Sequence, residues 1–427
     1  MHPELSKITN NLSQYSEKNL SKFTKENRND LENLVDNYID VLTKKIELEE
    51  AKNILKESGN NILHITAKFG CTEQIKKILE FINNSVSRAK SNDSSPDSTI
   101  QSYVNLRDSI FFTPLHYAAK NGWTDIVKIL IANGADINVK TSIKDREWMP
   151  IHYCAKNNHL EILKILLDSG VNKEAKTAFG LTPLIVAAEF GHLNLVKFLL
   201  TIGANKNAVT IEENHSMNAL HYAAVGGFSD VVLELIKAGM NKEAVTNSDM
   251  TALYLAVSSG SSEVINVLLK NGAKSNVTSA AGYDILYLAA SKGKKSVLST
   301  LLKWGIGDLE KAEKIFKGSP ENEITEELGR YKKAIKNLFA LKNLPENFSQ
   351  MLRSFTKQNL DENLITLENN VSFNAYGILG LRQEHGIFSK EKISLTQLAF
   401  KKGISDIFDQ LTNLEKLTGL YKPDTSF

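Results

Sequence analysis

The sequence has few cysteines, almost no net charge and no long apolar run. Cys71 and Cys154 are the two cysteines of 427 residues and lie far apart, so we expect a reducing compartment and no disulfide framework. No stretch of about 18 apolar residues occurs and no apolar signal core opens the chain, so neither a membrane span nor an ordinary signal peptide is expected. The formal net charge of +2 gives no electrostatic case for binding nucleic acid or an anionic membrane.

What the sequence does contain is a short block that occurs seven times. The clearest copy is Thr113-Pro-Leu-His-Tyr-Ala-Ala, and the copies begin at Asn61, Thr113, Met149, Thr182, Asn218, Thr251 and Asp284. Their starts are 52, 36, 33, 36, 33 and 33 residues apart. This period and pattern resemble the ankyrin repeat over residues 56–307. The resemblance implies a predominantly all-α solenoid of stacked helix-turn-helix units with β-hairpin fingers.

Small residues at fixed places in the unit explain why it can stack. Paired alanines such as Ala118 and Ala119 end the block and let neighbouring inner helices approach closely. A glycine then follows in most copies, where a left-handed turn is expected between the two helices, and Asn158 takes this place in one copy. The second helix of each unit is too short to be stable alone, so it must bury its apolar face against the next unit.

The segments on either side of the blocks follow other patterns. Residues 1–55 hold no block, but their apolar residues recur at helical spacing, which predicts a helical N-terminal cap. After Gly307 the period stops, and we interpret residues 308–393 as a mostly helical insertion or accessory domain.

A last segment, residues 394–427, resembles the repeat weakly. Ala399 and Gly403 align on Ala118 and Gly122, but the Pro-Leu-His core is missing. We interpret this segment as a degenerate terminal repeat followed by a tail. An unrelated pair of amphipathic helices is the alternative.

Few residues suggest chemistry. His64, His116, His152 and His221 stand at the fixed histidine of the repeat, where the resemblance implies hydrogen bonds to backbone between fingers. Stacked units place them in a row, whereas a metal site needs convergent ligands, so no metal and no cofactor are predicted. Cys154 replaces a small alanine and should be buried, while Cys71 is expected to be more exposed. His385 beside Glu384 is a weak catalytic signal in 308–393.

A better candidate site is a set of apolar residues just before each block. In the ankyrin family this place lies at a fingertip facing the groove, and here it holds Phe112, Trp148, Leu181, Met217, Met250 and Tyr283. Aromatic and Met side chains are common in binding hot spots, so these residues are predicted to contact a partner. Trp148 is the strongest candidate, together with Lys144 and Arg146 on the same extended finger. The alternative is that each packs against its neighbouring finger.

The pattern therefore favours a protein–protein interaction scaffold, expected to be monomeric. The chain has 7 Arg against 44 Lys and 40 Asn, as in an AT-rich genome, and ankyrin repeats in such a background resemble effectors of intracellular bacteria. That reading implies a host protein as partner and non-classical secretion into the host cytoplasm or nucleus. Two alternatives are an ankyrin protein of an AT-rich eukaryote and an effector enzyme with its active site in 308–393.

Overall fold

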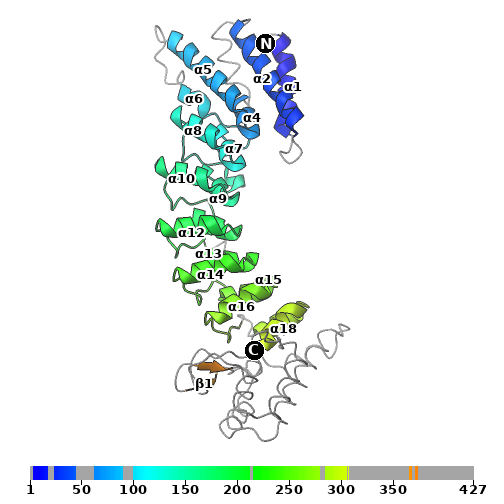
Figure 1. The fold of residues 1–427 in the computed structure, drawn as a ribbon, viewed down its shortest axis with the longest axis vertical. Coiled ribbons are helices and arrows are strands. Elements are labelled where there is room, and N and C mark those ends of the chain that lie inside the picture. Colours follow the sequence, from blue (N-terminus) through cyan, green and yellow to red (C-terminus); the bar gives the residue numbers. More distant parts are fainter. Residues whose placement is uncertain are drawn as a thin grey trace, which may run out of the picture. The chain divides into compact units, whose positions relative to one another are not determined.

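Helices dominate the described part of the chain (Figure 1). The computed structural model describes residues 3–17, 24–44, 62–89, 100–211, 215–278, 284–304, 306, 365–367 and 371–373. They divide between two compact units, Met1–Ala219 and Leu220–Phe427. The helix-turn-helix pairs confirm the fold class that the repeat pattern predicts. None of the described helices combines the length and the apolar character needed to span a membrane.

The first unit consists of helix pairs stacked in chain order. Its helices are α1 (Pro3–Glu17), α2 (Lys25–Lys44), α4 (Ile62–Phe69), α5 (Thr72–Ala89), α6 (Ile100–Val104), α7 (Pro114–Asn121), α8 (Thr124–Ala132), α9 (Pro150–Lys156), α10 (Leu160–Asp168), α11 (Pro183–Glu189) and α12 (Leu193–Thr201). The inner helices α4, α7, α9 and α11 pack on one another in turn, and α5, α8 and α10 form a second row. At the N-terminal end α1 packs on α4 and α2 on α5, so this pair extends both rows.

Packing between units, not helix length, stabilises these elements. Helix α7 has eight residues and α9 has seven, below the roughly 12–15 residues at which isolated helices become even marginally stable in water. Leu115 on α7 and Ile126 and Leu130 on α8 are fully buried between neighbouring pairs. The left-handed turn between the helices is confirmed at Gly122 (φ 83°) and at Asn158 (φ 62°).

The second unit continues the pattern. It comprises α13 (Ala219–Gly226), α14 (Ser229–Lys237), α15 (Ala252–Ser259), α16 (Ser262–Lys270), α17 (Ile285–Ser291) and α18 (Lys295–Lys303). Helix α14 packs on α16, α16 on α18 and α15 on α17. Further along, β1 (Ile365–Leu367) and β2 (Val371–Phe373) pair antiparallel with Ile365 opposite Phe373. The remainder of 308–393 and the proposed terminal repeat in 394–427 lie outside the described residues, so those assignments stay predictions.

Loops that we call fingers connect successive pairs: the first finger is 107–112, the second 140–148, the third 176–181, the fourth 209–217 and the fifth 245–250. A polar residue at the base clamps the last residue of each finger. In the second finger, the Thr141 N–H donates to the Trp148 carbonyl and the Trp148 N–H donates to Thr141 Oγ1, both at 2.9 Å. The same two bonds join Asp108 to Phe112, Thr177 to Leu181, Thr210 to Met217 and Thr246 to Met250.

The long fingers are also tied to their neighbours. The Ala178 N–H donates to the Arg146 carbonyl at 2.9 Å, and the Ile211 N–H donates to the Phe179 carbonyl at 3.1 Å. Residues Ile143–Asp145 of the second finger form a short 3-10 helix, η3. Regular β-hairpins were expected here, but the described fingers show turns and single bridges such as Val245 with Thr251.

Candidate functional site

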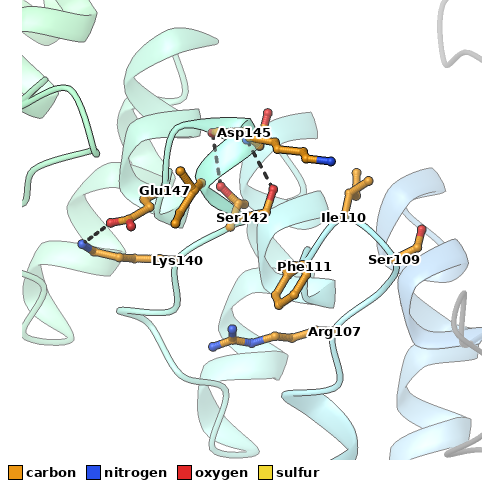
Figure 2. Close-up of a pocket in the computed structure, with 11 residues that line it drawn as sticks. Arg107, Ser109, Ile110, Phe111, Lys140, Ser142, Asp145 and Glu147 are labelled. Carbon is orange, nitrogen blue, oxygen red and sulfur yellow. Dashed lines mark hydrogen bonds and ion pairs between the residues drawn. The ribbon is translucent and has the colours of Figure 1, made fainter. Parts of the chain in front are cut away.

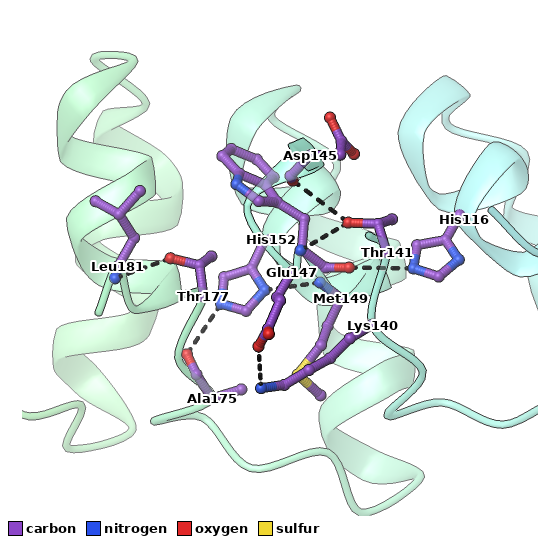
Figure 3. Close-up of polar contacts among 11 residues, drawn as sticks. His116, Lys140, Thr141, Asp145, Glu147, Met149, His152, Ala175, Thr177 and Leu181 are labelled. Atoms are coloured by element: carbon purple, nitrogen blue, oxygen red, sulfur yellow. Dashed lines mark hydrogen bonds and ion pairs between the residues drawn. The ribbon is translucent and has the colours of Figure 1, made fainter. Parts of the chain in front are cut away.

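The repeat histidines hold the fingers in place and are not ligands. His116 Nε2 lies 3.2 Å from the Trp148 carbonyl, and His152 Nε2 lies 2.9 Å from the Ala175 carbonyl (Figure 3). On the other ring nitrogen, His152 Nδ1 accepts the Met149 N–H at 3.1 Å. Burial lowers the pKa of His116 to about 3 and that of His152 to about 4, so both rings are neutral. The structural role predicted for these histidines is confirmed.

Neither cysteine is placed to act as a nucleophile. Cys154 is buried, as expected. Cys71 is also buried, so the expectation that it would be exposed is wrong. Burial raises the pKa of the Cys71 thiol to about 12 and raises that of Cys154 as well, which keeps both thiols protonated. Among the described residues, no group of three or more His, Cys, Asp or Glu side chains is placed to hold a metal ion.

The apolar residues just before each block do not form an exposed stripe. Phe112, Trp148 and Leu181 are buried, with exposed fractions of 3%, 5% and 1%. Met217 and Met250 are half-buried, and Tyr283 lies outside the described residues. The expectation of exposure is therefore wrong for the first three.

The clamp at the base of the finger explains this burial. It fixes both backbone groups of the last finger residue and turns its side chain toward the inner helices. The Phe112 ring lies 5.3 Å and the Trp148 ring 5.1 Å from the ring of Tyr153 on α9. The three side chains are thus packing groups, as the alternative held, but the contacts of Phe112 and Trp148 are with an inner helix and not with a neighbouring finger.

The two charged candidates of the second finger are exposed. Lys144 and Arg146 both face solvent. The Arg146 guanidinium lies 5.5 Å from the ring centre of Phe179 in the third finger. Their predicted role in binding a partner stays a prediction.

Among the described residues, most of the large apolar side chains that face solvent lie at other positions of the fingers. Ile110 and Phe111 in the first finger are 50% and 48% exposed, and Ile143 in the second is 76% exposed. In the fourth finger Val209 and Ile211 are exposed as well. Sequence reasoning missed this set because it chose the residue that the clamp turns inward.

One position of the finger could have pointed to Phe111 from the sequence alone. The residue before the clamped one has a left-handed backbone conformation in each of the five fingers. In the third finger this residue is Gly180, with φ 75°. Phe111 takes it in the first finger with φ 67°. A bulky residue where the turn favours glycine is unusual, and it could have been read from the alignment of the blocks.

A hollow of about 790 Å³ opens between the first and second fingers (Figure 2). Arg107, Phe111 and Ser142 all line this hollow, and in Figure 2 Phe111 lies between the other two. Ile143 and Lys144 also line it. We call it the finger hollow.

Two charged groups of the finger hollow are engaged with each other. Lys140 Nζ pairs with Glu147 Oε2 at 2.9 Å. A third charged group, Asp145, accepts a hydrogen bond from the Tyr153 hydroxyl. Asp145 therefore faces α9 as well as the hollow, and it joins the hollow to the inner helices.

Lysines stand at one register on three consecutive inner helices. They are Lys68 on α4, Lys120 on α7 and Lys156 on α9, and we call them the lysine row. Burial lowers the pKa of Lys68, and the nearby charge of Lys120 lowers it further. Burial likewise lowers the pKa of Lys120, which Asp145 raises and Lys156 lowers. Each lysine of the row therefore lies within electrostatic reach of the next.

Aromatic rings support the two later lysines. The Lys120 ammonium lies 5.4 Å from the centre of the Phe112 ring and 5.8 Å from that of Tyr153. The Lys156 ammonium likewise lies 5.4 Å from the centre of the Trp148 ring. Cations over aromatic faces are attracted by the ring quadrupole, so these contacts hold the ammonium groups in place while one side of each stays exposed.

Comparison with known proteins gives one family and several short matches. A family model described as ankyrin repeats (3 copies) matches residues 27–177, 115–210, 151–247 and 220–312, which together cover more than half of the chain. An ankyrin repeat domain-containing protein of Bos taurus is 54% identical over 39 residues, 9% of this chain and 16% of the relative. An ankyrin repeat protein of Rickettsia bellii is 49% identical over 45 residues, 10% of this chain and 14% of the relative.

A longer match of the same kind comes from a nematode. The ankyrin repeat and LEM domain-containing protein 2 homolog of Caenorhabditis elegans is 37% identical over 83 residues, 18% of this chain and 14% of the relative. The chain thus spans a small part of the length of each of these relatives.

Proposed function

Because this chain belongs to the ankyrin-repeat family, whose stacked units form extended binding surfaces, we propose that it binds a protein partner across the fingers and inner-helix ends of its first unit. The repeats are a protein-interaction scaffold. The proposed surface comprises the finger hollow, the lysine row and the exposed apolar side chains of the second and fourth fingers. Burial of Phe112, Trp148 and Leu181 moves the proposed contact from those residues to the fingertips.

The observation that carries this proposal is the conformation of Phe111. Its φ of 67° is a left-handed conformation, which typically costs a non-glycine residue about 1–3 kcal/mol. The side chain is 48% exposed, so burial on folding offsets only part of that strain. A partner that covers the ring would offset it, since aromatic residues are enriched at protein interfaces.

Phe111→Gly separates binding from stability. Glycine accepts the left-handed turn, so the variant should melt at the same or a higher temperature than the parent chain. Truncating a hot-spot residue typically costs about 2 kcal/mol or more, which is roughly a thirtyfold loss of affinity. The partner can be represented by peptides selected from a random display library on the native chain, with affinities measured by biolayer interferometry.

Asp249→Gly is the matched control, because Asp249 holds the same left-handed position in the fifth finger. It should leave the selected peptides bound as before. Selected peptides that bind Phe111→Gly as tightly as the native chain would place the recognition surface elsewhere. A lower melting temperature for Phe111→Gly would show that the ring supports the fold.

We further propose that the partner is a host-cell protein and that the chain is an effector delivered into the host cytoplasm. The excess of Lys and Asn over Arg and the similarity to a short stretch of a Rickettsia bellii protein support this proposal. A reporter enzyme that is active only in host cytoplasm, fused to the chain in an intracellular bacterium, should give signal during infection. The same reporter on a bacterial housekeeping enzyme is the control, and equal background signal from both fusions would contradict delivery.

The native chain should also be a monomer, as light scattering coupled to gel filtration can measure. A dimer at micromolar concentration would contradict this assignment.

A further inference from the structure

We infer that the partner segment recognised by the first unit is an acidic peptide with a bulky apolar side chain that docks in the finger hollow. This inference rests on the proposed function and names the chemistry of its partner. Three sets of observations carry it: the apolar lining of the hollow, the state of its charges, and the lysine row beside it.

The apolar lining has room for a large side chain. The hollow of about 790 Å³ falls in the range of roughly 300–1,000 Å³ typical of ligand sites. Ile110, Phe111 and Ile143 all line it, and each is about half exposed or more. A bulky apolar residue of a peptide would bury these three side chains, which the free protein leaves in water.

The charged side chains of the hollow differ in whether they are already paired within the protein. Glu147 pairs with Lys140, and Asp145 keeps its negative charge while it accepts a hydrogen bond from the Tyr153 hydroxyl. Arg107 and Lys144 line the same hollow, and neither forms an ion pair with another residue of the described chain. The lining holds three cations, Arg107, Lys140 and Lys144, against Asp145 and Glu147, so it is net positive although the net charge of the whole chain is close to zero.

The lysine row extends this positive region along the inner helices. Lys120 and Lys156 form no ion pair within the described residues. The charge of Asp145 raises the pKa of Lys120 and that of Lys156 lowers it, and Lys156 also lies within electrostatic reach of Glu189. Like charges held close together repel, so a carboxylate placed between them is favoured by both. Asp145 lines the hollow and accepts the Tyr153 hydroxyl, and the Lys120 ammonium lies 5.8 Å from the centre of the Tyr153 ring, so the hollow and the row are neighbours. One peptide can thus place an apolar residue in the hollow and carboxylates on the cations around it.

Synthetic peptides of one length test the inference directly. The probe is a fluorescein-labelled 12-residue peptide with a central Trp flanked by Glu residues. Three comparison peptides replace all Glu with Gln, replace all Glu with Lys, or replace the Trp with Ser. Fluorescence anisotropy on the full chain at about 50 and 300 mM salt should show that the acidic Trp peptide binds tightest, and that salt weakens it because exposed charges are screened.

Charge variants assign the effect to this surface. Arg107→Gln with Lys144→Gln should weaken the acidic peptide by roughly tenfold, since an exposed ion pair contributes about two- to fivefold. The same double variant should leave the Gln peptide unchanged. Lys128→Gln with Lys197→Gln removes the same charge from the outer helices α8 and α12 and is the matched control, expected to bind the acidic peptide like the parent chain.

The outcomes distinguish this inference from the proposed function. Tightest binding by the Lys or Gln peptide, with loss on Phe111→Gly, would overturn the acidic chemistry and leave the fingers as the binding surface. No binding of the acidic peptide, or binding that neither Phe111→Gly nor the charge variant weakens, would overturn the inference as well. If, in addition, peptides from the display library are indifferent to Phe111→Gly, the proposed surface fails too.

Discussion

Replacing Trp148 with alanine is expected to destabilise the first unit by about 3–5 kcal/mol. The side chain is 5% exposed, and a buried aromatic side chain removes about 150–250 Å² from water. At about 25 cal/mol per Å² this burial contributes roughly 4–6 kcal/mol, an upper estimate because the unfolded chain is already partly compact. Measured Trp and Phe truncations in cores fall at about 3–5 kcal/mol.

Local contacts explain why the site cannot easily close. The Trp148 ring lies 5.1 Å from that of Tyr153 and 5.4 Å from the Lys156 ammonium, and its carbonyl faces His116. Removing the indole takes away one of the rings beside Tyr153 and Lys156, which keep only Phe112 and Phe190 as aromatic neighbours on that side, whereas the backbone clamp to Thr141 remains. The finger should therefore stay closed around a cavity.

Urea unfolding followed by far-UV circular dichroism measures this effect. The midpoint should move to lower urea with little change of slope in the transition of the first unit. Ile143→Ala, on the same finger at 76% exposure, is the control and should stay within about 0.5 kcal/mol of the parent. A loss below about 1 kcal/mol for Trp148→Ala would refute the packing role and restore the indole as a candidate for direct partner contact.

Three other predictions concern the repeat framework. Folding lowers the pKa of His116 to about 3 and that of His152 to about 4, so the unfolded chain binds more protons than the folded chain below pH 6.5. The free energy of unfolding should therefore be full above pH 6.5 and fall toward pH 4 by about 1.4 kcal/mol per pH unit for each ring. Denaturant midpoints that stay flat between pH 7 and 5 would contradict this. Gly122→Val should lower stability by about 1–3 kcal/mol in a thermal melt, because Gly122 has φ 83° and an added Cβ would lie 2.7 Å from His159 Cε1. Asn158→Gly, at the equivalent turn of the next unit, should be neutral or slightly stabilising in the same measurement. Cys71 and Cys154 should not react with a thiol reagent in the native chain and should both react in urea, whereas a fast native reaction would show an opening of the fold.

The repeat framework could be predicted from the sequence because it depends on periodicity. The block spacing predicted the helix pairs, and Gly122 and its substitute Asn158 predicted the left-handed turns. The repeat histidines predicted the hydrogen bonds between fingers. These features repeat, so each copy supports the others. Signals of this kind survive single substitutions.

The direction of neighbouring side chains could not be predicted in the same way. Phe111 and Phe112 are adjacent and identical, yet one is 48% and the other 3% exposed. The difference comes from the clamp by Asp108, whose side chain and backbone fix Phe112, and a tertiary hydrogen bond of this kind has no periodic signature. The lysine row, by contrast, was not predicted, although its members stand at one register of the aligned blocks and the sequence alone could have revealed them.

The hydrogen bonds between neighbouring fingers bear on how fast a partner can dock. Because the Ala178 and Ile211 amides hold the carbonyls of the preceding fingers, those loops are ordered when the unit folds and not when it binds. Immobilising a side chain on binding typically costs about 0.5–1.5 kcal/mol of free energy. In this unit the cost comes from ordering side chains such as Ile143 and Lys144 more than from ordering the backbone. Encounter can then proceed with little rearrangement, and differences in affinity among partners should appear mainly in how slowly they leave.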